Sequence, residues 1–341
     1  MINLNKLVLL MFEEKGDRAM KIVVIGGNGH IGTYLTPNLV RAGHEVVNVS
    51  RGERKPYQND RAWSEVEHVK VDRHAADQDG TFGSLIRSLK PDIVMDIICF
   101  KPESAIQLVE ALEGDVQQLI HCGTIWVHGP SFQVPTKEEQ ARTPLGDYGR
   151  NKNAIEQYLL KKARLEQFPA TIVHPGHIVG QVWAPLNPAG HFNPNVFSQL
   201  ALGDELALPN FGLETVHHVH AADVAQMMEQ SMIHWKQAIG ESFHAVSPAA
   251  VTLRGYAEEV ASWFGQKANL TYLPWEEWKR TVTDDEASAT LDHIQRSPNC
   301  SIEKARRLLD YNPRYSSFEA VRESVEWLIE HNEINVDRRL H

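Results

Sequence analysis

KIVVIGGNGHIG, residues 21–32, decides the fold of this chain. Four apolar residues are followed by three glycines at GxxGxxG spacing and then by an amphipathic run, which predicts a buried strand, a tight turn and a helix. Gly26 permits the turn, Gly29 lets the backbone approach a pyrophosphate, and Gly32 lets the helix pack closely against the strand. The helix N-terminus is then free to hold a phosphate. The stretch therefore predicts dinucleotide binding, with an ordinary glycine turn as the alternative.

The end of the second apolar run indicates which dinucleotide binds. Residues 44–49 form this run, and Ser50 and Arg51 follow it at the place where an NAD-selective site carries Asp or Glu. An acid there repels a 2′-phosphate, whereas Arg51 attracts one and Ser50 can donate a hydrogen bond to it. We therefore expect NADP as the cofactor, with NAD as the alternative if Arg51 is only a solvated side chain.

The composition argues against several classes of protein. The chain has 341 residues and a formal net charge of −10, from 34 basic and 44 acidic residues, so we expect no nucleic-acid partner. Its three cysteines contain no CxxC pair, and without a credible secretion signal they favour a reducing cytoplasm. The apolar stretch 7–12 is too short to cross a membrane, so no membrane partner is expected. We expect the extension 1–19 to be poorly ordered.

Strand and helix patterns alternate from residue 20 onward, which predicts an α/β fold with a Rossmann-type, doubly wound parallel sheet. We expect a dinucleotide-binding domain over residues 20–180, to which 213–232 returns. Residues 181–341 are expected to form mainly a smaller C-terminal α/β substrate-binding domain. The predicted strands cover residues 22–25, 45–49, 67–71, 93–97, 118–121 and 170–173.

Two local features qualify this layout. The loop WAPLNPAGHFNP, residues 183–194, is rich in Pro, Asn and Gly and is expected to border a pocket. Pro37 lies inside the helix that should follow the glycines, and it removes one backbone donor. We expect this proline to kink the helix near Thr33 or to end it early.

Tyr148 and Lys152 are the candidate reactive pair. A spacing of four places both side chains on one helix face, where an ammonium group about 5–6 Å away favours ionisation of the phenol. Tyrosine otherwise has a pKa of about 10 and is a poor base at neutral pH. Thr124 follows a strand and can place a hydroxyl near a substrate oxygen. Without the glycine motif upstream, a solvated surface pair would be the better explanation of Tyr148 and Lys152, and Thr124 alone would be a cap or turn residue.

Together the glycine motif, the YxxxK pair and the strand end GTIWVHG (residues 123–129) resemble the short-chain dehydrogenase/reductase family. The resemblance is specifically to its extended branch of sugar-nucleotide epimerases, dehydratases and related reductases, in an atypical form. Further matches are VDR at 71–73, HPG at 174–176, VHAADVA at 219–225, IEKA at 302–305 and NP at 312–313.

The resemblance implies a role for each matched residue. Tyr148 would exchange a proton with a substrate hydroxyl or carbonyl, Lys152 would lower its pKa and hold the nicotinamide ribose, and Thr124 would orient the reacting oxygen. His177 would face the substrate, a small molecule. The residues expected to contact the cofactor are Gly26, Gly29, His30, Ile31, Gly32, Ser50, Arg51, Asp72, Arg73, Ile98, Cys99, Phe100, Pro175 and Gly176. The resemblance also implies a homodimer that packs helices near residues 103–113 and 148–164.

Departures from the family pattern narrow the activity. Ile125 and Trp126 stand where 4,6-dehydratases carry an Asp-Glu pair, so the second acid and base that elimination of water needs are missing there. Val216 stands where many relatives place an arginine on a nucleoside diphosphate, so a smaller or uncharged substrate becomes plausible. His174 and Asp96 replace the arginine and histidine that are usual in the family, and the sequence explains neither exchange.

Two kinds of function fit these observations. The first is an enzyme that oxidises or reduces a secondary alcohol or ketone of a sugar-like molecule, or that epimerises it with a retained cofactor. The second is a non-catalytic, dinucleotide-binding regulatory protein, since some chloroplast RNA-associated relatives share the signatures at 51–52 and 72–73. The complete set of Thr124, Tyr148 and Lys152 favours the enzyme. We expect no metal, although residues 217–220 contain three histidines.

Overall fold

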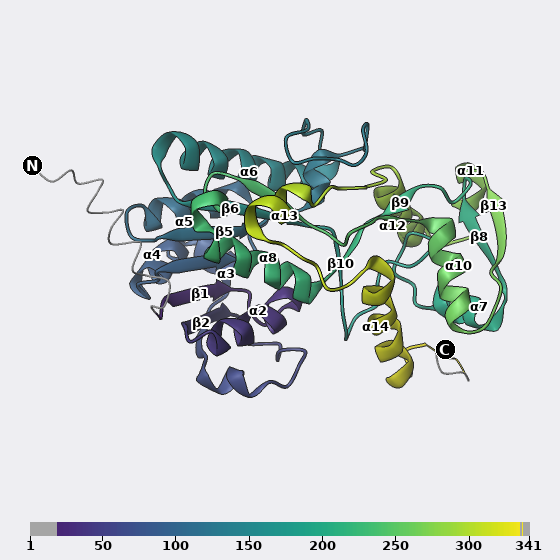
Figure 1. Cartoon of the computed structure of the whole chain (residues 1–341), viewed down its shortest axis with the longest axis horizontal. Helices are drawn as coiled ribbons and strands as arrows, with labels where there is room; N and C mark the ends of the chain where they lie inside the picture. The colour runs from purple at the N-terminus through teal and green to yellow at the C-terminus, as the bar shows by residue number, and fades with distance from the viewer. Residues whose placement is uncertain (1–18, 335, 337–341) are drawn as a thin grey trace, which may run out of the picture.

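Seven parallel strands form the central sheet, in the order β11-β6-β5-β4-β1-β2-β3 (Figure 1). The computed structural model describes residues 19–334 and 336. We expected residues 1–19 to be poorly ordered. Residues 1–18 of this extension lie outside the described residues. The strands are β1 (Lys21–Ile25), β2 (Glu45–Ser50), β3 (Glu67–Lys70), β4 (Ile93–Asp96), β5 (Gln118–Cys122), β6 (Ala170–Pro175) and β11 (Ser242–Ala245). All six strands predicted for the first half are present, and β11 is an addition that the sequence did not indicate.

Helices cover both faces of this sheet, as the alternating pattern predicts. Along β1, Ile22 and Val24 belong to one core cluster, and Val23 and Ile25 belong to another on the opposite face. The first core includes side chains of α2 (His30–Arg41), α8 (Ala221–Ile233) and α13 (Glu303–Leu309). The second includes side chains of α3 (Arg73–Gln78), α4 (Phe82–Ser88), α5 (Pro102–Leu112) and α6 (Gly146–Glu166). The doubly wound α/β fold is therefore confirmed.

A smaller lobe has its own core and three two-stranded sheets (Figure 1). Its strand pairs are β7 (His177–Val179) with β10 (His218–His220), β8 (Glu205–Pro209) with β13 (Asn269–Leu273), and β9 (Thr215–Val216) with β12 (Val251–Thr252). Its helices include α7 (Asn195–Leu202), α10 (Leu253–Trp263), α11 (Trp275–Trp278), α12 (Asp284–Ile294) and α14 (Ser317–Glu330). The three short helices of the chain not yet named are η1 (Arg61–Glu65), η2 (Ile125–His128) and α9 (Trp235–Ala238). The chain beyond residue 180 returns to the larger lobe in α8, β11 and α13.

The prediction that Pro37 ends the first helix early is wrong. Helix α2 continues through Pro37 to Arg41. Pro37 is buried, and its neighbours Leu35 and Leu39 are both fully buried in the first core. Proline removes one backbone hydrogen bond, whereas burial of this apolar face stabilises every turn of the helix. The tertiary packing therefore outweighs the local penalty.

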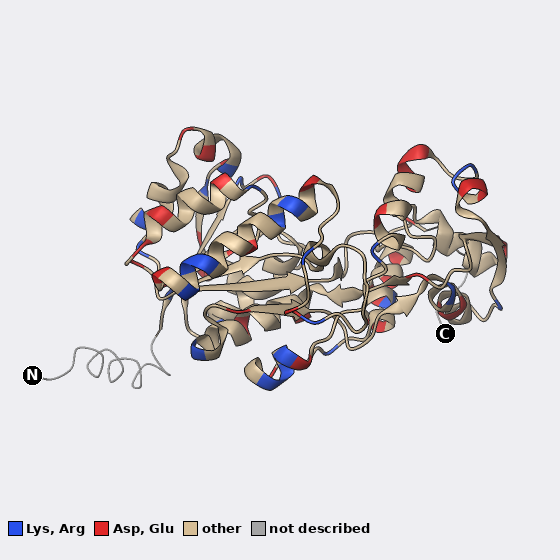
Figure 2. Cartoon of the chain, turned by 90° about the horizontal axis from the view of Figure 1, so that it is seen from above, with Lys and Arg blue, Asp and Glu red and all other residues tan. Residues whose placement is uncertain are grey.

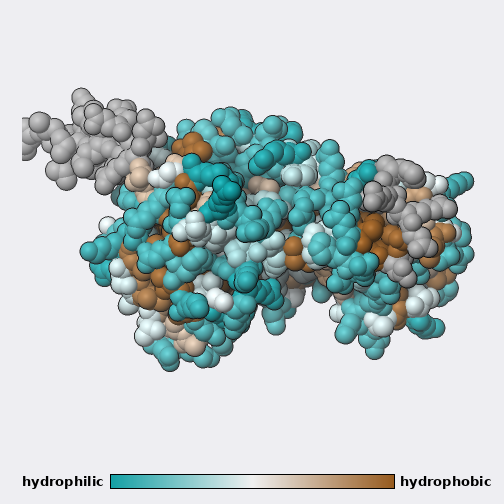
Figure 3. Space-filling view, turned by 90° about the horizontal axis from the view of Figure 1, so that it is seen from below, coloured by the Kyte–Doolittle hydropathy of each residue, from teal (hydrophilic) through white to brown (hydrophobic). Residues whose placement is uncertain are grey.

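The charges on both lobes are mixed in sign. Figure 2 shows acidic and basic positions interspersed on the helices of both lobes. On the face in Figure 3, hydrophilic residues predominate and the hydrophobic residues form separate patches. Across residues 19–334 and 336, no helix has the length and apolar character needed to span a bilayer.

Close packing at the β1–α2 turn explains two of the glycines. Gly26 has φ +92°, and a Cβ there would lie 2.6 Å from the Ile98 side chain. A Cβ on Gly32 would overlap the backbone of Gly27. A Cβ on Gly29 would approach only one carbonyl oxygen, at 3.4 Å. The turn therefore needs glycine at 26 and 32 for packing, whereas Gly29 faces free space.

Gly32→Ala should lower the free energy of unfolding by about 2 kcal/mol or more, because the rigid backbone of Gly27 has to move. Gly29→Ala is the matched control: the backbone of Gly29 is extended at φ −83°, so its unfolding free energy without cofactor should change by less than about 1 kcal/mol. Urea denaturation measures both values. Equal losses in the two variants would contradict the assignment of Gly32 to packing.

Candidate active site

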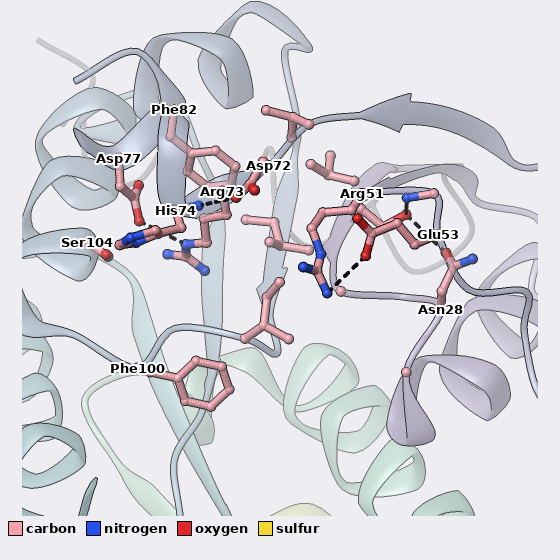
Figure 4. Close-up of a pocket in the computed structure, with 18 of the residues that line it drawn as sticks. Asn28, Arg51, Glu53, Asp72, Arg73, His74, Asp77, Phe82, Phe100 and Ser104 are labelled. Carbon is pink, nitrogen blue, oxygen red and sulfur yellow. Dashed lines mark hydrogen bonds and ion pairs between the residues drawn. The ribbon is translucent and has the colours of Figure 1, made fainter. Parts of the chain in front are cut away.

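The carboxyl ends of β1, β2 and β4 border a groove of about 450 Å³ (Figure 4). This is the edge at which open α/β sheets bind their ligands. Figure 4 shows Arg51 beside Glu53 on one side of the pocket and Arg73, His74 and Asp77 on the other. Eight of the residues predicted to contact the cofactor line it: Gly26, Gly29, Ser50, Arg51, Asp72, Arg73, Ile98 and Phe100.

The other predicted cofactor residues do not line this groove. Cys99 is fully buried in the second core, and burial raises the pKa of its thiol to about 12, so its side chain does not face a cofactor. Ile31 is likewise buried in the first core, which leaves only its backbone for a contact. His30 stacks against Trp183 of the smaller lobe. Gly32, Pro175 and Gly176 lie outside the lining as well.

The start of α2 has the form of an anion site. Gly29 is the N-cap residue, and no side chain caps the helix in its place. The first N–H groups of the helix are therefore free of a side-chain acceptor, next to the open space above Gly29. A pyrophosphate fits these donors, and the Cβ of any other residue would enter the same space.

Arg73 and Asp96 form a buried ion pair that explains one departure from the family. Two guanidinium nitrogens of Arg73 donate to the two oxygens of Asp96, at 2.5 and 3.0 Å. Burial alone would lower the pKa of Arg73, but the Asp96 carboxylate outweighs it and raises this pKa. Asp72 caps α3 by accepting from the backbone N–H of His74. Arg73 therefore stabilises the groove wall, and its charge is already compensated.

Ser50 and Arg51 lie at the end of β2 and line the groove. Arg51 is more than half exposed and pairs with Glu53 at 3.2 Å. The Ser50 hydroxyl donates to Asn28 in the glycine-rich turn, whose amide in turn donates to the carbonyl of Arg54. Asn28 and Arg54 line the groove and were not predicted. The position of Asn28 between two glycines of the motif is the sequence signal that could have predicted its place in the groove.

Thr124 and Tyr148 are brought together beside this groove. Thr124 lies two residues after β5 and caps η2, accepting from the Trp126 N–H, while Tyr148 lies in the first turn of α6. The Thr124 hydroxyl lies near the phenol and favours the phenolate. Burial of the Tyr148 hydroxyl outweighs this influence and raises the pKa of Tyr148 to about 12, although 43% of the residue is exposed.

The expected lowering of the Tyr148 pKa by Lys152 does not occur in the protein alone. The Lys152 ammonium donates to the carbonyl of Cys122 at 2.6 Å and lies 4.9 Å from the centre of the Phe100 ring. Burial lowers the pKa of Lys152. The helical spacing does place both side chains on one face, but the strand carbonyl holds the ammonium group. The sequence could not show this acceptor.

His174 explains the second departure from the family. Its Nδ1 accepts the Thr124 backbone N–H at 2.9 Å, and its Nε2 lies 3.0 Å from Glu156, two turns beyond Tyr148 on α6. Nδ1 is an acceptor and carries no proton, so Nε2–H donates to the carboxylate. A Cβ on Gly123 would also overlap the His174 ring. His174 thus joins the backbone of Thr124 to the helix that carries Tyr148.

Glu156 is the buried charge behind this link. Arg142 binds it with two nitrogens, at 2.9 and 2.7 Å. Burial would raise the pKa of Glu156, but His174 and Arg142 outweigh it and hold this pKa well below its usual range. Arg142 also contacts His128, which lies 2.8 Å from His244. The sequence analysis missed this whole network, whose members are far apart along the chain.

No metal site is proposed. Within the described residues, Asp96, Cys99 and His121 could offer ligand atoms within 4.8 Å of one another. Asp96 is already bound to Arg73, whose charge opposes a cation. The three neighbouring histidines at 217–220 each bond to different protein groups: Ser247, Leu186 and the start of α8.

Comparison with known proteins agrees with this geometry. The family model described as "NAD dependent epimerase/dehydratase family" matches residues 22–244. The chain belongs to this family. It is therefore an enzyme of the extended short-chain dehydrogenase/reductase type, as its motifs predicted.

Three similar proteins illustrate the range of the family. The chain is 27% identical to the chloroplast stem-loop binding protein of 41 kDa b of Arabidopsis thaliana, over 89% of this chain and 78% of that protein. It is 25% identical to 2′-dehydrokanamycin reductase of Streptomyces kanamyceticus, over 79% of this chain and 73% of that protein. The solved UDP-glucose 4-epimerase of Thermotoga maritima, in complex with UDP-glucose, is 20% identical to this chain and superposes on it with a TM-score of 0.69. The match covers 92% of this chain and 100% of that chain. The last likeness concerns the fold alone.

Glu156→Gln should lower the free energy of unfolding by about 3 kcal/mol, because the partly buried Arg142 loses its anion. Glu258→Gln, which breaks an exposed pair with Arg254, should cost less than about 0.5 kcal/mol. Urea denaturation at neutral pH measures both.

The difference between wild type and Glu156→Gln should shrink in acid. The folded-state pKa of Glu156 is depressed, so its contribution is full above the unfolded-state value of about 4.3 and fades as the pH falls below it. A loss in Glu156→Gln no larger than in the Glu258 control would contradict the role of this carboxylate.

Proposed function

We propose that this enzyme transfers hydride between a nicotinamide cofactor and a secondary alcohol or ketone of a sugar-like small molecule, with Tyr148 as the acid and base. The placement of Thr124 and Tyr148 close together beside the groove carries the proposal. Two hydroxyl groups from separate elements can both reach one substrate oxygen from there. Family membership supplies the type of cofactor.

The groove residues assign positions to the dinucleotide. The start of α2 and Gly29 would hold the pyrophosphate, and Ile98 and Phe100 would border the ribose on the nicotinamide side. When bound, the nicotinamide ring supplies the acceptor or donor of hydride. Lys152, once released from the Cys122 carbonyl, can reach a ribose hydroxyl from the same helix face.

The protein residues handle the proton. In alcohol oxidation, Tyr148 takes the hydroxyl proton while Thr124 holds the same oxygen; in ketone reduction, the phenol returns the proton to that oxygen. A pKa near 12 keeps Tyr148 protonated at neutral pH in the free enzyme, which suits the direction of ketone reduction. Oxidation needs positive charge from Lys152 or the bound cofactor near the phenol to lower this pKa.

We further propose NADP as the preferred cofactor. Ser50, Arg51 and Arg54 border the part of the groove that follows β2, and the charge of Arg51 is only partly neutralised by the exposed Glu53. NAD is the alternative.

An epimerase with retained cofactor is the second candidate. The solved UDP-glucose 4-epimerase supports the same fold, and the pair of Thr124 and Tyr148 serves both reactions. Val216, however, is buried in the core of the smaller lobe and offers no charge to a diphosphate. This observation favours net oxidation or reduction.

A cytoplasmic homodimer remains part of the proposal. The apolar face of α6 at Ile155 and Leu159 is buried in the core of the chain itself. A dimer through α5 and α6 would therefore use their other faces, where Lys162 pairs with Glu113.

Tyr148→Phe should lower hydride transfer by about 100-fold or more, because the phenol that exchanges the proton is lost. The dissociation constant of the cofactor should change by less than about twofold, since the ring remains. Stopped-flow absorbance of the reduced nicotinamide and fluorescence titration measure the two quantities. Full turnover in this variant would refute Tyr148 as the acid and base.

Arg51→Ala should weaken NADP binding by about tenfold or more and leave NAD binding unchanged, because the lost hydrogen bond is made to a charged group. Arg87→Ala is the control, since Arg87 is similarly exposed and also pairs with one carboxylate, Asp115. Titration calorimetry gives the affinities of both variants for NADP and for NAD. A parallel loss for NAD and NADP would remove the assignment.

A further inference from the structure

Six rings form a continuous row that begins at the dinucleotide groove and ends in the smaller lobe. Neighbouring ring centres along it are 6.4, 5.9, 5.3, 5.7 and 5.4 Å apart. In order, the rings belong to Phe100, Tyr148, Trp126, His293, Phe192 and His177. We refer to these six residues as the aromatic row.

The row joins both lobes through the proposed acid and base. Phe100 follows β4 and lines the dinucleotide groove, where Figure 4 shows its ring on the wall of the pocket. Phe192 belongs to the loop 183–194, which the sequence singled out as a pocket border. Tyr148 is the second ring of six. A molecule bound along the row therefore reaches the phenol that exchanges its proton.

Much of the row is open to solvent. Phe100 is 51% exposed, Tyr148 43% and Phe192 45%. Large apolar rings that lie together at a surface indicate a binding site, because their exposure to water is unfavourable. Rings with a few polar groups between them are typical of small-molecule sites.

The row offers little positive charge to an anion. Burial lowers the pKa of His293 and holds that of His177 well below its ordinary value, so both rings are neutral at pH 7. Of the described cations, Lys152 lies over Phe100 and is bound by the Cys122 carbonyl.

Arg296 is the other described cation that contacts the row. Its guanidinium lies 3.8 Å from the centre of the Trp126 ring. It is bound by Asp292 and by the carbonyl of Leu145. Its Nε has no partner but is enclosed by protein, so it cannot meet a ligand along the row. Of these two cations, Arg296 is paired with Asp292, and Lys152 is held by the Cys122 carbonyl and is assigned above to the cofactor ribose.

We propose that the substrate carries an uncharged, hydroxyl-rich ring without phosphate, such as a saccharide or cyclitol, and that Phe192 and Trp126 hold the apolar face of this ring. The neutral ring of His177 is then available to hydroxyl groups, each of which can donate and accept, whereas Nδ1 of His293 is held by the Ala289 carbonyl. A diphosphate would bring two negative charges to a wall at which neither of the two described cations is free to bind them. This inference rests on the proposed function, because it defines the substrate of the same site.

The test is saturation-transfer NMR on the full chain saturated with NADP⁺, so that nucleotides cannot occupy the groove. The probes are methyl glucopyranoside, methyl galactopyranoside and myo-inositol at millimolar concentration, with glucose 1-phosphate and UDP-glucose as charged competitors. At least one neutral ring should receive saturation, and neither charged compound should displace it.

Phe192→Ala should weaken binding of that ring by about tenfold, as expected for one lost aromatic contact. Phe211→Ala is the matched control, because it removes another exposed phenyl group of the smaller lobe, 74% exposed. It should leave binding unchanged. Circular dichroism and a thermal melt establish that both variants are folded.

Three results would overturn the inference: no saturation of any neutral ring, displacement by a charged competitor, or equal binding to wild type and Phe192→Ala. Saturation transfer and hydride transfer, both measured on Tyr148→Phe, separate the two proposals. If that variant binds the neutral ring and still transfers hydride, the proposed acid and base fails while the substrate class holds.

Discussion

A buried carboxylate organises the site of this enzyme. Glu156 lies in the core with almost no exposed surface and binds Arg142 on one side and His174 on the other. Leaving such a charge unpaired would cost several kcal/mol, so the three side chains have little freedom to move apart. Because His174 also accepts the backbone N–H of Thr124, this constraint fixes the end of β5 relative to α6. Thr124 and Tyr148 are held close together as a consequence.

The sheet places a second set of groups at the same edge. Parallel strands end together, so the turn after β1 and the loop after β4 border one groove, and the loop after β5 carries Thr124 beside it. The buried ion pair of Arg73 and Asp96 stabilises the wall of this groove. The aromatic row then continues from Phe100 towards the smaller lobe. The positions proposed for the cofactor, the acid and the substrate ring thus lie on adjacent surfaces.

The sequence predicted what depends on local pattern and failed where distant residues decide. Strands β1 to β6 and the glycine turn follow from periodicity and from backbone sterics, so they were predicted correctly. Cys99 was assigned to the cofactor because it follows β4, yet its side chain is fully buried in the second core. The carbonyl that holds Lys152 lies 30 residues away along the chain, and the partner of His174 lies 18 away. No spacing rule connects such pairs, and only the fold brings them together.

The central claim is that Thr124 and Tyr148 act as one pair, held by His174 and Glu156 and turned towards the nicotinamide. A crystal structure of the NADP⁺ complex tests it most directly. The account predicts the two hydroxyl oxygens within about 3.2 Å of each other and facing the nicotinamide C4, with Nδ1 of His174 still accepting from Thr124. A phenol turned away from the cofactor, or a His174 ring that has left Thr124, would contradict the account.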